Sequence, residues 1–66
     1  MHRFFVEEPA MGANSITITG GDVNHIKNVL RMSVGDKICV INGQNNKEYY
    51  CEITALGSDT VDTRIC

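Results

Sequence analysis

The chain has 66 residues, of which 42% are hydrophobic, and it carries a formal net charge of −2. A chain of this length forms one small domain, whose core supplies only about 3 to 5 kcal/mol of net stability, so it has little capacity to sustain a large catalytic cleft. The negative net charge excludes a protein that binds polyanions through an overall positive charge. Any contact with nucleic acid must therefore come from a local cluster of cations.

The first half of the chain predicts two strands. Arg3 to Val6 forms the first, and Ser15 to Thr19 alternates polar with β-branched apolar residues and forms the second. Pro9 and Gly12 interrupt the pattern, which predicts a loop between the strands. The chain has neither the apolar region of a secretory signal nor a run of about 18 apolar residues, so we expect a soluble cytoplasmic protein with no membrane segment.

A short amphipathic helix is predicted from Gly21 to Leu30. Apolar residues recur at helical spacing and form one stripe, while amide and cationic side chains lie on the opposite side. Thr19-Gly20-Gly21-Asp22 has the Thr-x-x-acid pattern that satisfies free amides at a helix start. The apolar stripe consists of Val23, Ile26, Val29 and Leu30. The opposite side carries Asn24, Lys27, Asn28 and Arg31.

The segment after the helix predicts a turn and a buried strand. Gly35, within Val34-Gly35-Asp36, is expected to take a positive φ that costs other residues energy. The strand from Lys37 to Ile41 has an unbroken apolar run that indicates deep burial. Asn42 to Asn46 predicts a hairpin loop, with Asn-Gly as its strongest element.

Two further strands complete the pattern. The strand from Glu48 to Ala55 alternates as a half-buried antiparallel strand requires, and one face carries Tyr49, Cys51, Ile53 and Ala55. A turn at Gly57-Ser58-Asp59 leads to the last strand, from Thr60 to Ile65. Five short strands and one helix in so few residues favour a small barrel with the helix at one end. An open sheet with a helix on one face is the alternative.

The three cysteines, Cys39, Cys51 and Cys66, have no C-x-x-C spacing, and free thiols are predicted for a cytoplasmic protein. Cys39 and Cys51 lie symmetrically about the hairpin loop, and a register that placed them opposite each other would permit a disulfide. The cysteines could also meet His2 and His25 around a metal. Because paired ligand spacing is lacking, we expect no metal site.

The chain resembles one protein family along almost its whole length. The matching segments are Arg3-Phe4-Phe5-Val6, Ile16-Thr17-Ile18-Thr19-Gly20, His25 in the helix, Val29-Leu30-Arg31-Met32, Val34-Gly35-Asp36 and Asn42-Gly43. This order of motifs is similar to the amino-terminal region of the RsmE family of ribosomal RNA methyltransferases.

The resemblance implies that residues 1–66 form a PUA-like RNA-binding domain, a mainly β small barrel of about five strands with one short helix. In the family, this domain helps hold 16S ribosomal RNA of the small subunit. It is joined to a carboxy-terminal SPOUT domain, which binds S-adenosylmethionine, forms the homodimer and methylates N3 of a uridine. We expect this chain to lack that second domain. RNA recognition without catalysis or a bound cofactor is therefore the implied role.

Four side chains are candidates for RNA contact: Arg3, His25, Lys27 and Arg31. The two arginines match the family motifs, and a guanidinium can donate two hydrogen bonds to a phosphate at once. The alternative for Arg3 is an ordinary surface charge. The alternative for Arg31 is a cation at the end of the helix, where it interacts favourably with the helix dipole. His25 either stacks on a base or donates to a phosphate, or it is a partly buried structural histidine. Lys27 and Arg31 are spaced i, i+4, so they either reach one phosphate track or form a solvated polar face.

The aromatic residues divide between core and surface. Phe4 and Tyr49 are predicted to pack in the core, whereas Phe5 and Tyr50 lie on the opposite strand faces and are available for stacking on bases. No Ser-His-Asp grouping, convincing carboxylate pair or phosphate-cradling loop occurs, so no catalytic residue is assigned. The alternative function is a small barrel that makes protein contacts within a larger assembly, through the Asn-rich loop and the helix face.

Overall fold

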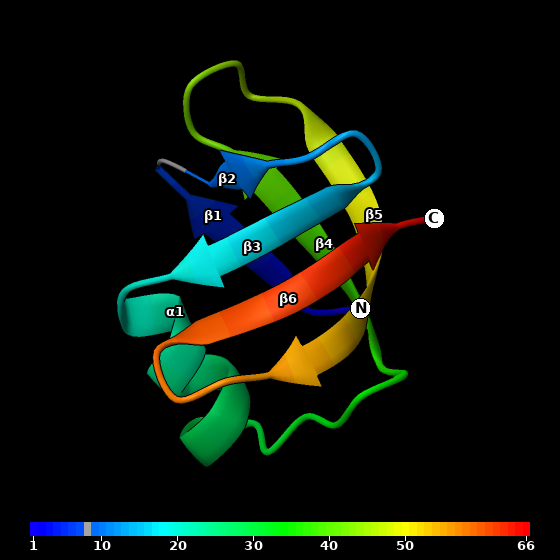
Figure 1. Cartoon of the computed structure of the whole chain (residues 1–66). Coiled ribbons are helices and arrows are strands. Elements are labelled where there is room, and N and C mark those ends of the chain that lie inside the picture. The colour runs from blue at the N-terminus through cyan, green and yellow to red at the C-terminus, as the bar shows by residue number, and fades with distance from the viewer. Residues whose placement is uncertain (8) are drawn as a thin grey trace.

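The computed structural model describes residues 1–7 and 9–66. Over these residues the chain forms one curled sheet of six strands, and a short helical segment lies at one end of the curl (Figure 1). The strands are β1 (Arg3–Val6), β2 (Ala10–Met11), β3 (Ser15–Thr19), β4 (Lys37–Asn42), β5 (Glu48–Leu56) and β6 (Thr60–Ile65). The helical segment consists of α1 (Gly21–Asn24) and η1 (His25–Val29). The predicted fold class, mainly β with one short helix, is confirmed.

The sheet has the strand order β1-β4-β5-β6-β3-β2. β1 pairs with β4 in parallel, and the other neighbouring pairs are antiparallel. Together the strands make a curled half-barrel (Figure 1). All five predicted strands are present. The sixth, β2, lies in the segment that the sequence predicted as a loop, where Ala10 pairs with Thr17 and Met11 pairs with Ile16.

The core fills the inner side of the curled sheet because alternate residues of each strand point inward. The isoleucines at 16, 18, 38 and 53 are completely buried, as are Val40 and Val61. Two helix residues, Val23 and Ile26, close this core at the end of the curl. Within β4, residues 38 to 40 are all buried, which confirms the deep burial predicted for this strand.

A bulge changes the second half of β5. The pairing between β5 and β6 shifts register between Ile53 and Ala55, so Ala55 pairs with Asp62 and Leu56 pairs with Val61. Ala55 is therefore exposed, and Leu56 packs against the core. The predicted inward position of Ala55 was wrong because strict alternation fails where one strand contains an extra residue.

A positive φ occurs at four of the described residues, of which Gly35 and Asn46 lie in the loops on either side of β4. Gly35 has a φ of 98°, which confirms the predicted positive φ. In the hairpin loop the left-handed residue is Asn46, with a φ of 59°, rather than Gly43. Gly43 is required for a different reason, because a Cβ there would lie 2.9 Å from the backbone of Glu7 and 3.1 Å from the ring of Phe5.

The cysteines are free thiols, as predicted. Cys39 pairs with Tyr50 across the hairpin, and Cys51 pairs with Ile38, so the register does not place the two cysteines opposite each other. Both thiols are buried, and burial raises the pKa of each. In the described part of the chain, no helix is long and apolar enough to cross a membrane.

Candidate nucleic-acid interface

The helical segment begins regularly and then widens. Its N-cap is Gly20, whose φ is 81°, and no side chain caps the helix. The predicted cap at Thr19 was therefore wrong. From His25 onward the segment is a π-helix, in which the Leu30 amide donates to the His25 carbonyl at 2.9 Å. A π turn is wider than an α turn, and such turns are frequent at functional sites.

The wide turn changes which side chains face the core. Ile26 is completely buried, whereas Val29, three residues later, is 61% exposed. The predicted apolar stripe is thus correct for Val23 and Ile26, in part for Leu30, and wrong for Val29. Side chains three residues apart share one face of an α-helix, and the wider turn with its i→i+5 hydrogen bond removes that alignment.

Lys27 points away from the sheet's inner face toward the turn between β5 and β6. Its ammonium donates a hydrogen bond to the Gly57 carbonyl, and its side chain is half-buried. No carboxylate among the described residues forms an ion pair with Lys27. The hydrogen bond joins the helix to the turn, and the positive charge has no ion-pair partner among residues 1–7 and 9–66.

Arg31 lies beyond the end of the helix. Its φ is 52°, and its side chain is exposed and forms no ion pair within the described residues. A residue with a Cβ in this left-handed region costs roughly 1 to 2 kcal/mol. Because the helix ends at Val29, the predicted i, i+4 helical relation between Lys27 and Arg31 does not hold. The two cations belong to the same end of the molecule but to different local structures.

His25 and Arg3 lie on opposite sides of β1. His25 is exposed, and its ring meets the inward-facing Phe4 edge-on, with 5.9 Å between the ring centroids. The Arg3 guanidinium is on the outer face, where Nη1 lies 3.3 Å from Oε1 of Glu48. No hydrogen bond or ion pair in the described structure joins Arg3 to Lys27 or Arg31. The structure therefore places three candidates around the helix and the fourth across the strand.

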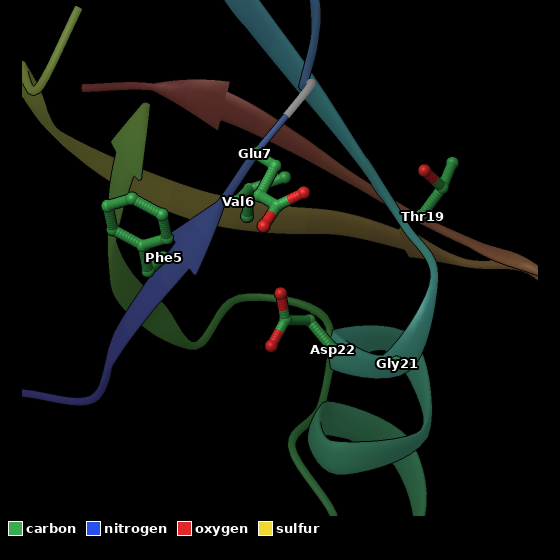
Figure 2. A pocket seen from close by; sticks show the side chains of 6 residues that line it. All are labelled: Phe5, Val6, Glu7, Thr19, Gly21 and Asp22. Carbon is green, nitrogen blue, oxygen red and sulfur yellow. The ribbon is translucent and has the colours of Figure 1, made fainter. Parts of the chain in front are cut away.

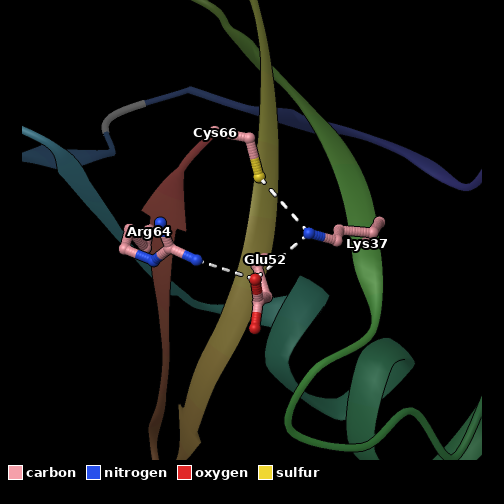
Figure 3. Close-up of polar contacts among 4 residues, drawn as sticks. All are labelled: Lys37, Glu52, Arg64 and Cys66. Carbon is pink, nitrogen blue, oxygen red and sulfur yellow. Dashed lines mark hydrogen bonds and ion pairs between the residues drawn. The ribbon is translucent and has the colours of Figure 1, made fainter.

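The remaining cations of the sheet are paired with a carboxylate. Oε1 of Glu52 accepts from Arg64 at 2.8 Å and from Lys37 at 3.1 Å, and Cys66 lies on the other side of the lysine (Figure 3). The hydrogen bond from Lys37 is the main cause that lowers the pKa of Glu52, and the same contact raises the pKa of Lys37. Only Lys27, Arg31 and Lys47 have no carboxylate partner among the described residues.

The predicted division of the aromatic rings between core and surface is confirmed. Phe4 is 3% exposed and Tyr49 packs against the core, whereas Phe5 and Tyr50 are each 56% exposed. Phe5 pairs with Ile41, and Tyr50 pairs with Cys39, so both rings lie on the outer face that carries Arg3.

A polar groove of about 300 Å³ separates the helical segment from the β5–β6 turn. We call it the helix–turn groove; it is lined by Gly20, Val23, Asn24, Lys27, Asn28, Ser58 and Asp59. Asn28 Nδ2 donates to Asn24 Oδ1 at 2.7 Å, which places two amides side by side along one wall. The sequence showed these asparagines on the polar helix side and showed the turn, but it carried no signal that the two would meet.

A second hollow, of about 450 Å³, lies between the end of β1 and the start of α1. Figure 2 shows the carboxylates of Glu7 and Asp22 pointing into it, with Phe5 at its side. The described lining of this hollow includes two carboxylates and no Lys or Arg side chain. Among the described residues, no three His, Cys, Asp or Glu side chains come together to hold a metal ion.

The chain is similar in sequence to known proteins. A family model described as an RNA methyltransferase PUA domain matches residues 18–66. The chain is 38% identical over 64 residues to the ribosomal RNA small subunit methyltransferase E of Bacillus subtilis, with 92% of this chain and 25% of that protein covered. The chain thus spans about a quarter of the length of this relative.

Two solved structures establish the same fold. A Thermotoga maritima protein described as a predicted RNA methyltransferase superposes with a TM-score of 0.83 at 23% identity, covering 100% of this chain and 29% of that one. The ribosomal RNA small subunit methyltransferase E of Neisseria gonorrhoeae, bound to S-adenosylmethionine, gives a TM-score of 0.76 at 23% identity, covering 98% and 26%. From the family match and the Bacillus relative, this chain belongs to the RNA methyltransferase PUA domain family, in its RsmE type.

Proposed function

We propose that this domain binds 16S ribosomal RNA and orients it for a methyltransferase domain that lies outside these 66 residues. The observation that carries the proposal is the position of the unpaired positive charge. Two of the three cations without a carboxylate partner in the described structure, Lys27 and Arg31, lie at the helical end of the molecule. A local cluster of this kind is what an acidic domain needs in order to hold a phosphate backbone.

In this proposal Lys27 and Arg31 contact phosphates. The lysine keeps N–H donors beyond the one directed at Gly57, and the exposed arginine offers its planar pair of donors. His25 is exposed beside them and supplies a ring or a donor. Arg3 extends the contact across β1, because the guanidinium has more donors than its single contact with Glu48 uses.

We infer that the methyltransferase domain binds S-adenosylmethionine, forms a homodimer and methylates N3 of a uridine. N3 lies on the Watson–Crick edge, so the target must be unpaired or flipped out when it is methylated. A domain that grips the flanking backbone leaves that edge accessible. The isolated domain is proposed to bind RNA in the cytoplasm during small-subunit assembly and not to catalyse.

The test is the salt dependence of RNA binding. A labelled 16S rRNA hairpin is titrated with the chain and its variants at several salt concentrations, and fluorescence anisotropy gives the affinity. Each single-strand phosphate contact that is lost lowers the slope of log affinity against log salt by about 0.7. Lys27→Gln, Arg31→Gln and Arg3→Gln should each weaken binding and flatten this slope.

Lys47→Gln is the matched control. Lys47 is also a cation without a carboxylate partner among the described residues, but it lies in the β4–β5 loop at the opposite end of the molecule from the helical segment (Figure 1). Its substitution changes the net charge equally and should leave the slope unchanged. Equal slopes for all variants and the unaltered chain would contradict the assigned contacts.

A protein-contact module is the second candidate, and the exposed rings of Phe5 and Tyr50 on the outer sheet face favour it. Aromatic residues are enriched where proteins meet. This function predicts association with a protein that is insensitive to salt and is lost in Tyr50→Ser, with no RNA binding above background. RNA binding that depends on Lys27 and is retained in Tyr50→Ser would exclude it.

A further inference from the structure

The helix–turn groove is built from two elements that are far apart in the sequence. The helical segment supplies one wall, and Ser58 and Asp59 of the β5–β6 turn supply the other. The Lys27 ammonium bridges the walls through its hydrogen bond to the Gly57 carbonyl. Gly20 leaves its part of the rim open, since a Cβ at that position would meet nothing within 4 Å. The groove has a volume of about 300 Å³, which places it at the small end of ligand sites.

The wall formed by Asn24 and Asn28 has unused hydrogen-bonding capacity. One bond, from Asn28 Nδ2 to Asn24 Oδ1, joins the two side chains at 2.7 Å. Each amide has one donor group and one acceptor, so this bond leaves the other donor group of the pair and the other acceptor free. The same holds if both amides are turned over. The pair therefore offers an unused donor group and an unused acceptor to the groove, and these are the two kinds of group through which asparagine contacts the edge of a base.

The charges of the groove indicate which part of a nucleotide enters it. Asp59 lines the turn wall of the groove, so its carboxylate disfavours a phosphate at that wall, whereas the Lys27 ammonium in the same lining favours one on its own side. A neutral base has no such penalty, and its N–H groups can donate to a carboxylate. Val23 provides the apolar part of the lining. When a base occupies the groove, the Lys27 ammonium, which joins the two walls, contacts the phosphate of the same nucleotide.

We propose that the helix–turn groove takes up one unpaired base of single-stranded RNA, whose edge is read by the Asn24–Asn28 amide pair. This inference rests on the proposed RNA-binding function and adds to it a site that selects the base. The contacts of Lys27 and Arg31 supply affinity without regard to sequence, whereas the amide pair supplies the preference for one base over another.

The experiment compares single-stranded RNA oligomers of equal length. The probes are labelled oligouridylate, oligocytidylate, oligoadenylate and a ribose-phosphate oligomer without bases. We expect the chain to bind one of the base-bearing oligomers more tightly than the others and to bind the oligomer without bases at least several-fold more weakly. Amide contacts to one base discriminate by roughly fivefold to a hundredfold.

The test variant is the Asn24→Ala, Asn28→Ala double substitution. Alanine is a better helix former than asparagine, so the helix should persist, and far-UV circular dichroism checks this. The double variant should bind the oligomers with nearly equal affinity, and the salt slope should stay as in the unaltered chain. Asn14→Ala, which changes an exposed asparagine outside the groove, should retain the base preference.

The outcomes separate this inference from the function on which it rests. If the double variant retains the base preference, or if the oligomer without bases binds as tightly as the others, the groove is not a base site, while RNA binding itself stands. If the unaltered chain binds no oligomer and no 16S rRNA hairpin above background, the proposed RNA-binding function fails as well. Loss of preference with an unchanged salt slope is the result that supports the proposal.

Discussion

The π-helical turn makes a sharp prediction about two apolar residues of the same helix. Ile26 is completely buried, and Val29 is 61% exposed, although helical spacing places both on one stripe. Ile26→Val removes one buried methyl group and should lower the free energy of unfolding by about 0.5 to 1.5 kcal/mol. Ile26→Ala should lower it by about 2 to 5 kcal/mol, which is the whole stability of a domain of this size.

Val29→Ala is the matched variant. It truncates a side chain that already faces solvent and replaces valine with a better helix former, so the free energy of unfolding should change by less than about 0.5 kcal/mol. Urea and thermal unfolding followed by circular dichroism measure both variants. For a chain this short, each kcal/mol shifts the melting temperature by roughly 4 to 8 °C. A loss above about 1 kcal/mol for Val29→Ala would place Val29 in the core and refute the π-helical geometry.

Three other predictions follow from the turns, the thiols and the ion pairs. Gly35→Ala should lower the free energy of unfolding by about 1 to 2 kcal/mol in urea denaturation, because the added Cβ meets nothing within 4 Å and the cost comes only from the backbone at a φ of 98°. If Gly35→Ala left the free energy of unfolding unchanged, the backbone at residue 35 would have moved out of its positive φ, and the reasoning would be wrong. With Ellman's reagent, the exposed Cys66 should react at once, and the buried Cys39 and Cys51 only on unfolding; immediate reaction of all three would contradict their burial. Because folding lowers the pKa of Glu52, its contribution to stability is present above its ordinary value of 4.5 and is lost as the pH falls through the lower folded value. Stability measured against pH should therefore decline less steeply below 4.5 in Glu52→Gln, and an unchanged profile would show that the carboxylate contributes nothing.

The candidate site was only partly predictable. The sequence placed Lys27 and Arg31 on the polar side of the predicted helix; both lie at the helical end of the structure, but Lys27 is half-buried and Arg31 lies beyond the last helical residue. It did not show that Lys27 reaches Gly57, 30 residues away, or that Asn24 and Asn28 face a turn of the last hairpin. Such contacts depend on where the sheet carries the hairpin, and periodicity within one segment contains no information about that.

The sequence by itself determined the strands β1, β3 and β6 to the residue, and it determined which aromatic rings are buried. These features follow from local alternation, because a strand that is apolar on one face has only one way to bury it. The parallel pairing of β1 with β4, the bulge after Ile53 and the wide turn after His25 were decided by tertiary packing. Each depends on the fit between elements that are distant in the chain, so the free energy that selects it arises only when the sheet has curled around its core.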